Sequence, residues 1–169
     1  MLQSTQLDNH IVQLINKNLV WDNHSCMPLR GTDLSFLPEL KQFRDAGVDI
    51  VSLNVGFDSV SWENTPLMLA SFRHWISEHE NEYALVKTTH DIEKAKQTGK
   101  LGITFDIEGA SALNGQLSMV EMYYDLGVRW MLMPYNQNNI VGGGCQDEDQ
   151  GLSAFGKEVL DEMMRVGMV

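Results

Sequence analysis

The stretch LPELKQFRDAGVDIVSLNVG, residues 37–56, contains a helix pattern followed directly by a strand pattern. Pro38 stands near a first helical turn, where its missing N–H is not needed, and Gly47 follows the helix, where glycine commonly ends it. The apolar, β-branched run VDIVSLNV comes next. A strand without polar alternation is typical of a parallel sheet that is buried on both faces. This stretch therefore predicts one helix–strand unit of an α/β fold.

The same order of helix, glycine and apolar strand recurs along the chain. It is found in HDIEKAKQTGKLGITFDIEG (90–109) and QLSMVEMYYDLGVRWMLMPY (116–135), and SAFGKEVLDEMMRVGMV (153–169) begins a further round. Helices that alternate with strands indicate right-handed βαβ units. We also expect an N-terminal helix at 5–18 and a long helix at about 64–80. The four strands that we predict lie at about residues 19–24, 48–55, 101–107 and 129–135.

The predicted fold class is α/β, a parallel (β/α) barrel of the TIM type with only about its first four βα units present. A complete barrel of eight units needs about 250 residues, whereas this chain has 169. We expect one domain over 1–169, with the N-terminal helix in 1–18 and four βα units in 19–169. Met168 and Val169 follow the helix-ending Gly167, where earlier rounds begin a strand. We therefore expect the chain to be the N-terminal half of a barrel.

Charge and composition narrow the class of protein. Twenty-three acids against twelve bases give a net charge of −11, which argues against nucleic-acid partners and against attraction to anionic membranes. No apolar run is long enough to span a bilayer, and the N-terminus lacks the pattern of a signal peptide. Two cysteines, Cys26 and Cys145, are too few for a disulfide scaffold and fit a reducing compartment. We expect a cytoplasmic protein.

The first predicted strand ends in an unusual polar stretch, VWDNHSCMPL, residues 20–29. Asp22, His24 and Cys26 occupy alternate positions, and alternate side chains of an extended strand point to the same face. Histidine and cysteine are also metal ligands, so the three side chains can converge on a metal ion. The same residues also suit a polar loop in which the thiol is a small buried hydrophobe.

Polar residues also follow the third and fourth predicted strands, and chemistry in α/β barrels lies at the carboxyl ends of strands. Glu108, directly before Gly109, ends the third strand, and Tyr135 and Asn136 follow the fourth. An acid at the end of an apolar strand is costly unless it binds something. Glu108 is therefore a candidate for chemistry, although it also suits a capping or salt-bridging role.

Four segments together resemble consecutive signatures of the membrane (renal) dipeptidase family of zinc metallopeptidases. They are WDNHSCMP, GITFDIEGASAL, LGVRWMLMPYNQNN followed by GGGC, and GLSAFGKEVLDEMMRVGM. The resemblance implies a metallo-hydrolase barrel with two zinc ions that are bridged by a glutamate. It also implies hydrolysis of dipeptides by a metal-activated water, and in some members the hydrolysis of related amides.

The resemblance assigns roles to residues of this sequence. His24 matches a histidine ligand, and Glu108 matches the bridging, catalytic glutamate. Cys26 stands where the family has an aspartate ligand, and a thiolate is a suitable zinc ligand. Tyr135 stands where many members have a substrate-contacting histidine, and Asn136 follows it, so we expect both to bind substrate.

The remaining family ligands have no counterpart in the chain. We therefore expect full activity only together with a C-terminal half, and an inactive chain without it. Half a barrel also leaves two open sheet edges, which predicts either homo-oligomers or assembly with the missing half. Two alternatives stay open: a truncated, non-catalytic relative that binds metal weakly, and a related amidohydrolase that acts on another small amide.

Overall fold

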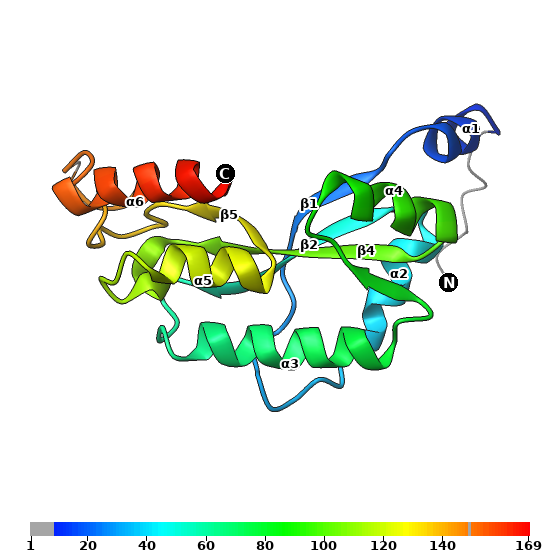
Figure 1. The fold of residues 1–169 in the computed structure, drawn as a ribbon, viewed down its shortest axis with the longest axis horizontal. Helices are drawn as coiled ribbons and strands as arrows, with labels where there is room; N and C mark the ends of the chain where they lie inside the picture. The colour runs from blue at the N-terminus through cyan, green and yellow to red at the C-terminus, as the bar shows by residue number, and fades with distance from the viewer. Residues whose placement is uncertain (1–8, 149) are drawn as a thin grey trace.

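The computed structural model describes residues 9–148 and 150–169 of the chain. At its centre lies a five-stranded sheet in which every pairing is parallel (Figure 1). Strand β1 pairs with β2 and β2 with β4, while β3 and β5 share the other edge of β4. The strands are β1 (Trp21–Ser25), β2 (Ile50–Phe57), β3 (Tyr83–Leu85), β4 (Leu101–Glu108) and β5 (Val128–Leu132).

The four predicted strands correspond to β1, β2, β4 and β5, and they pair in sequential order. The short strand β3 was not predicted, because three residues are too few to show a period. Helix α1 covers part of the predicted segment 5–18, of which residues 5–8 lie outside the described residues. The α-helices are α1 (Asn9–Lys17), α2 (Lys41–Asp45), α3 (Asn64–Glu78), α4 (Thr89–Thr98), α5 (Met119–Leu126) and α6 (Ala154–Val166).

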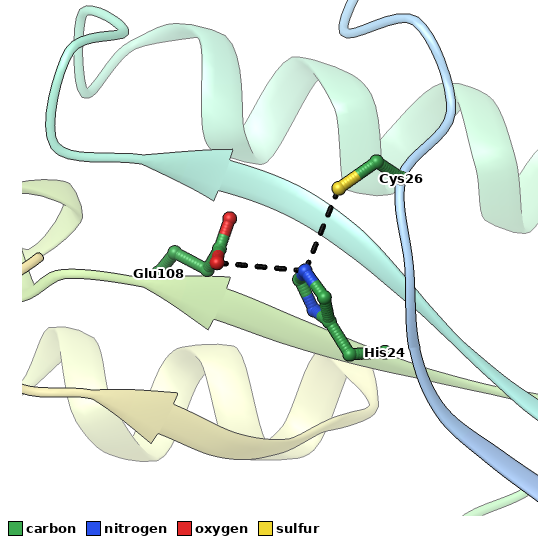
Figure 2. Close-up of side chains that lie close together, drawn as sticks. All are labelled: His24, Cys26 and Glu108. Carbon is green, nitrogen blue, oxygen red and sulfur yellow. Dashed lines mark hydrogen bonds and ion pairs between the residues drawn. The ribbon is translucent and has the colours of Figure 1, made fainter.

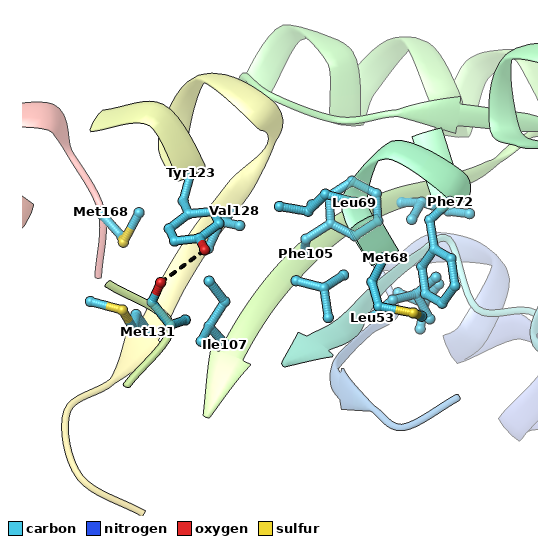
Figure 3. Packing of buried hydrophobic residues seen from close by; sticks show 14 of the residues in the cluster. Leu53, Met68, Leu69, Phe72, Phe105, Ile107, Tyr123, Val128, Met131 and Met168 are labelled. Carbon is cyan, nitrogen blue, oxygen red and sulfur yellow. Dashed lines mark hydrogen bonds between the residues drawn. The ribbon is translucent and has the colours of Figure 1, made fainter. Parts of the chain in front are cut away.

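The main hydrophobic core lies on the face of the sheet that α3 covers, which we call the outer face. Leu53 of β2 and Phe105 of β4 are completely buried there, and the ring of Phe72 from α3 lies 6.5 Å from that of Phe105 (Figure 3). Tyr123 of α5 donates a hydrogen bond to the carbonyl of Ala112 within the same core. Helices α2, α3 and α5 lie on this side of the sheet (Figure 1). The apolar strands therefore bury their outer side chains as predicted.

The opposite, inner face is different, because its half toward the carboxyl ends of the strands is polar. Ser52 and Asn54 of β2, and Thr104 and Asp106 of β4, are buried polar residues. Alternate positions on β2 and β4 thus carry apolar side chains outward and polar side chains inward. The half toward the amino ends of the strands is covered by α4, which lies across the sheet from α3 (Figure 1). Ile50, Val86 and Ala95 form a small core cluster there.

A wide cavity of about 600 Å³ opens between β1, α4 and β5 on the same inner face. The rings of Trp21 and Trp130 lie 6.1 Å apart beside it, and Trp21 and Leu132 are 38% and 47% exposed. At the edge of β5, the Val169 N–H donates to the Arg129 carbonyl and the Met131 N–H donates to that of Val169. These bonds follow the pattern of a parallel strand, as expected at this position.

Candidate metal centre

The end of β1 is irregular, and this irregularity changes the direction in which its side chains point. Asp22 pairs with Val51 and Ser25 with Leu53, so three steps along β1 match two along β2. Such a bulge breaks the strict alternation of side chains and commonly redirects one at a functional site. The Asp22 carboxylate accepts hydrogen bonds from the Ser25 hydroxyl and the His24 N–H. The expectation that Asp22, His24 and Cys26 share one face is therefore wrong for Asp22.

His24, Cys26 and Glu108 converge at the carboxyl end of the sheet (Figure 2). The His24 Nε2 atom lies 3.4 Å from Glu108 Oε1 and 3.5 Å from Cys26 Sγ. One ligand atom from each residue lies within 4.8 Å of the other two. The His24 side chain is 40% exposed and that of Glu108 21% exposed, so the group is open to solvent. All three residues were predicted as metal ligands from the sequence.

Two of the three spacings fit a single metal ion, while Cys26 Sγ and the Glu108 oxygen lie within 4.8 Å of each other. Ligand atoms around one tetrahedral zinc ion lie about 3.3–3.6 Å apart, given Zn–N and Zn–O distances of about 2.0–2.1 Å and Zn–S of about 2.3 Å. The distances from His24 Nε2 to Glu108 Oε1 and Cys26 Sγ, 3.4 and 3.5 Å, fall within this range. Imidazole, thiolate and carboxylate together are also a donor set suited to zinc.

Asp106 lies beneath this group and is 1% exposed. Its Oδ2 atom is 2.7 Å from His24 Nδ1, and its Oδ1 accepts a 2.8 Å hydrogen bond from the Ser52 hydroxyl. The Asn54 amide nitrogen lies 3.5 Å from Asp106 Oδ2 and 3.4 Å from Glu108 Oε2. Three strands therefore share one polar network below the candidate ligands.

The electrostatics of the group favour a cation. Burial raises the pKa of the Cys26 thiol, and the nearby Glu108 and Asp106 carboxylates raise it further. Burial also raises the pKa of Glu108, against the opposing effect of His24. Burial raises the pKa of Asp106, although the Ser52 and His24 hydrogen bonds favour its charged form. A bound divalent ion would stabilise the thiolate and carboxylates together.

Tyr135 and Asn136, the predicted substrate-binding residues, lie in different surroundings. Tyr135 lines a cavity of about 360 Å³ that Cys26 and Glu108 also line, and its ring packs edge-on against Phe57 at 6.1 Å. Asn136 is not among the residues that line this cavity, and its side chain accepts a hydrogen bond from Cys145. The structure thus brings Tyr135 to the metal group and turns the Asn136 amide toward its own loop.

Two important acids went unassigned in the sequence analysis. Asp106 stands two residues before Glu108, a spacing that places both side chains on one face of β4. This spacing was the feature of the sequence that could have indicated a role for Asp106 beside Glu108. Asp58 follows β2, and its carboxylate accepts from the backbone N–H groups of Ser111 and Tyr135 and from the Asn139 amide. It holds the loop that carries Tyr135. No sequence pattern signals this role, because its partners lie 53–81 residues away.

Comparison with known proteins identifies the family. Residues 37–169 match the family model described as membrane dipeptidase, peptidase family M19. The chain belongs to the membrane dipeptidase family. Glu108 lies within the matched range, whereas His24 and Cys26 precede it. Among curated relatives, an uncharacterized dipeptidase of Schizosaccharomyces pombe is 31% identical over a 105-residue alignment that covers 57% of this chain and 25% of that protein.

Solved structures share the fold of this chain. An amidohydrolase from Pseudomonas aeruginosa is 30% identical with a TM-score of 0.83, over 94% of this chain and 46% of that one. A metallopeptidase from Rhodobacter sphaeroides, solved with a phosphinate mimic of the dipeptide L-Ala-D-Ala, shares the fold at 16% identity. Its TM-score is 0.72, over 88% of this chain and 56% of that one. The predicted resemblance and fold class are confirmed.

The comparisons also define what the chain covers. It spans about half the length of the solved structures that it matches. The family is one of metallopeptidases, which implies a metal cofactor. Among the described residues, no helix combines the length and the apolar character needed to cross a membrane.

Proposed function

We propose that this chain provides the first part of the metal centre of a zinc-dependent dipeptidase. The observation that carries the proposal is the convergence of His24, Cys26 and Glu108 at the carboxyl end of a parallel sheet. The family match over residues 37–169 supports the reaction class, hydrolysis of a dipeptide. His24 Nε2, Cys26 Sγ and a Glu108 oxygen would hold zinc. Bound zinc supplies Lewis-acid polarisation of a peptide carbonyl and lowers the pKa of water.

Each side chain has a separate task in this proposal. Glu108 has one oxygen directed toward His24 and the other toward Asn54, so its carboxylate is held at both oxygens. A fixed carboxylate with two oxygens is suited to contact two cations, as the resemblance implies. Cys26 contributes a thiolate in place of the family aspartate, which makes the site softer and favours zinc over oxygen-preferring ions.

The cavity beside the metal group is the proposed site for a substrate side chain. It is lined by Met27, Leu29 and Phe57 in addition to Tyr135, so it presents apolar walls next to polar ligands. Such a combination is typical of small-molecule sites, where a few polar groups fix orientation. We propose that Tyr135 contacts the dipeptide directly. The expectation that Asn136 also binds substrate stays a prediction, and its side chain accepts a hydrogen bond from Cys145.

The three donors are fewer than two zinc ions require, because two tetrahedral ions present about eight coordination positions. We therefore propose that the 169-residue chain binds zinc weakly and is inactive on its own. Full activity then needs the second half of the barrel. The exposed inner face around Trp21 and Leu132 is the surface for this half or for a second copy of the chain. Sedimentation should show self-association that replacing Trp21 and Trp130 by serine reduces, and monomeric wild-type chain would contradict this.

The assay that tests the proposed activity uses a chimera. Residues 1–169 would replace the matching 46% of the Pseudomonas aeruginosa amidohydrolase. The zinc-loaded chimera should hydrolyse dipeptides but not tripeptides, and Glu108→Gln should abolish hydrolysis while circular dichroism stays unchanged. Hydrolysis that survives Glu108→Gln would contradict the role of Glu108.

Two alternatives give different results in the same assay. A folded, zinc-loaded chimera that cleaves no dipeptide but opens another small amide would favour the related amidohydrolase. A chimera that folds and binds no zinc would favour the non-catalytic relative.

We also propose that the protein is cytoplasmic. Cys26 and Cys145 are both free and exposed, which is the state that a reducing compartment maintains. Fractionation of cells with an antibody against the chain tests this proposal, and recovery outside the cytoplasmic fraction would contradict it.

A further inference from the structure

Asp106 is an acidic residue with a buried side chain, and burial is unfavourable for a carboxylate unless other interactions stabilise it. Its side chain is 2% exposed, and among the described residues its ion-pair contact is with the His24 ring rather than with a lysine or arginine. A buried carboxylate is stable only when hydrogen bonds replace its lost hydration. Donors from β1 and β2 provide those bonds.

We propose that Asp106 is a positioning residue that fixes the ring of His24 as the Nδ1–H tautomer, with Nε2 directed toward Cys26 and Glu108. A carboxylate only accepts hydrogen bonds, so the 2.7 Å contact requires the hydrogen on Nδ1. A neutral imidazole has one ring hydrogen, which leaves the Nε2 lone pair free for a metal. The inference deepens the proposed function, and its tautomer claim can be measured without a metal.

The direction of the Asp106 carboxylate is itself fixed. Ser52 donates to Oδ1, which leaves Oδ2 facing β1 and His24. Asn54 links this carboxylate to the next one, because its amide nitrogen lies within 3.5 Å of Asp106 and 3.4 Å of Glu108. One buried acid therefore sets the ring orientation of one ligand and shares a donor with another. Supporting groups of this kind fix the tautomer and the ring orientation of a metal-binding histidine.

The first test is ¹⁵N NMR of the metal-free chain, roughly two pH units above the ordinary histidine pKa of about 6.5. The His24 signals are those lost in His24→Ala. In the wild type, His24 Nδ1 should be protonated and Nε2 unprotonated. In Asp106→Asn, the amide can offer His24 either an acceptor or a donor, so both tautomers should be populated.

Two controls separate positioning from a general loss of structure. Asp49→Asn removes the same charge near the opposite end of β2, where Asp49 pairs with Lys96, and should leave the His24 tautomer unchanged. His79, whose Nδ1 lies 2.8 Å from the Trp75 carbonyl, should keep its own signals in every variant. Ser52→Ala is a smaller change, and it should shift the populations of the two His24 tautomers in the same direction as Asp106→Asn.

The second test is zinc affinity by competition with a chromophoric chelator. Asp106→Asn should weaken zinc binding on the order of 10–100-fold, whereas Asp49→Asn should not change it. A wild-type His24 that is protonated on Nε2, or a tautomer unmoved by Asp106→Asn, would overturn the inference. Absence of zinc binding in the wild type would overturn the proposed function, while the NMR result would still decide the role of Asp106.

Discussion

On the outer face of the sheet, Leu53 and Phe105 are completely buried, whereas on the inner face Trp21 and Leu132 remain 38% and 47% exposed. The outer face is closed by helices of this chain, so its core is complete. The inner face carries the polar network and the candidate ligands above an apolar layer that is only partly covered by α4. Stability is therefore concentrated on one face and chemistry on the other. Changes to the two faces should have separable effects.

The largest expected effect comes from truncating matched leucines on the two faces. Leu53→Ala on the outer face should lower the free energy of unfolding by about 2–5 kcal/mol, because it leaves a cavity in a closed core. Leu132→Ala on the inner face should change it by less than about 1 kcal/mol, because this side chain is 47% exposed. Urea denaturation of both variants measures the difference. Equal losses would show that the inner face is packed in solution.

The next effect concerns the backbone that carries Glu108. Gly109 has φ +104°, and a Cβ there would clash with the Asp58 carboxyl group. Gly109→Ala should therefore destabilise the chain by about 3 kcal/mol and displace the adjacent Glu108. Gly99→Ala is the matched control, with φ +66° but no atom near the added Cβ, and should cost about 1 kcal/mol. Gly109→Ala should lower both the free energy of unfolding and the zinc affinity more than Gly99→Ala does.

The smallest effect concerns α4, which covers the inner face. The Thr88 hydroxyl accepts a hydrogen bond from the Asp91 N–H, and the Asp91 carboxylate accepts from the Thr88 N–H. Thr88→Ala should lower the free energy of unfolding by about 1 kcal/mol and should leave zinc affinity unchanged. Denaturation and a zinc titration on one preparation would check both, and a change in affinity would show that α4 also supports the ligands.

The same cap should give a pH dependence. Burial raises the pKa of Asp91, but hydrogen bonds from Thr88 and Lys87 outweigh it and leave the pKa lowered. A folded pKa below the unfolded value of about 3.9 stabilises the fold above that pH, and this stability is lost as pH falls through the folded pKa. The stability difference between wild type and Asp91→Asn, measured by urea denaturation, should therefore shrink below about pH 4.

The sequence predicted the fold well because its signals are local. Helix-ending glycines such as Gly99 and Gly127 have positive φ, and the apolar runs before and after them give β2, β4 and β5. Strand β3 escaped because it is three residues long and lies between two helices. Its place on the edge of β4 depends on pairing rather than on its own residues.

The candidate site was predictable in its residue types but not in its geometry. Alternation placed Asp22 beside His24 and Cys26, and the bulge that separates them arises only when β1 pairs with β2. The role of Asp106 was hidden for the same reason, because its contact with His24 joins residues 82 positions apart. Side chains at strand ends can be recognised from sequence, whereas the groups that orient them are set by the assembled sheet.

The central claim is that His24, Cys26 and Glu108 bind one metal ion with Cys26 as a thiolate ligand. Titration of the chain with cobalt(II) tests it directly, because a thiolate on cobalt gives a charge-transfer absorption in the near ultraviolet. We predict this band in the wild type and in Cys145→Ser, which changes the other exposed cysteine, and its loss in Cys26→Ser and His24→Ala. A band that persists in Cys26→Ser, or no band in the wild type, would contradict the account.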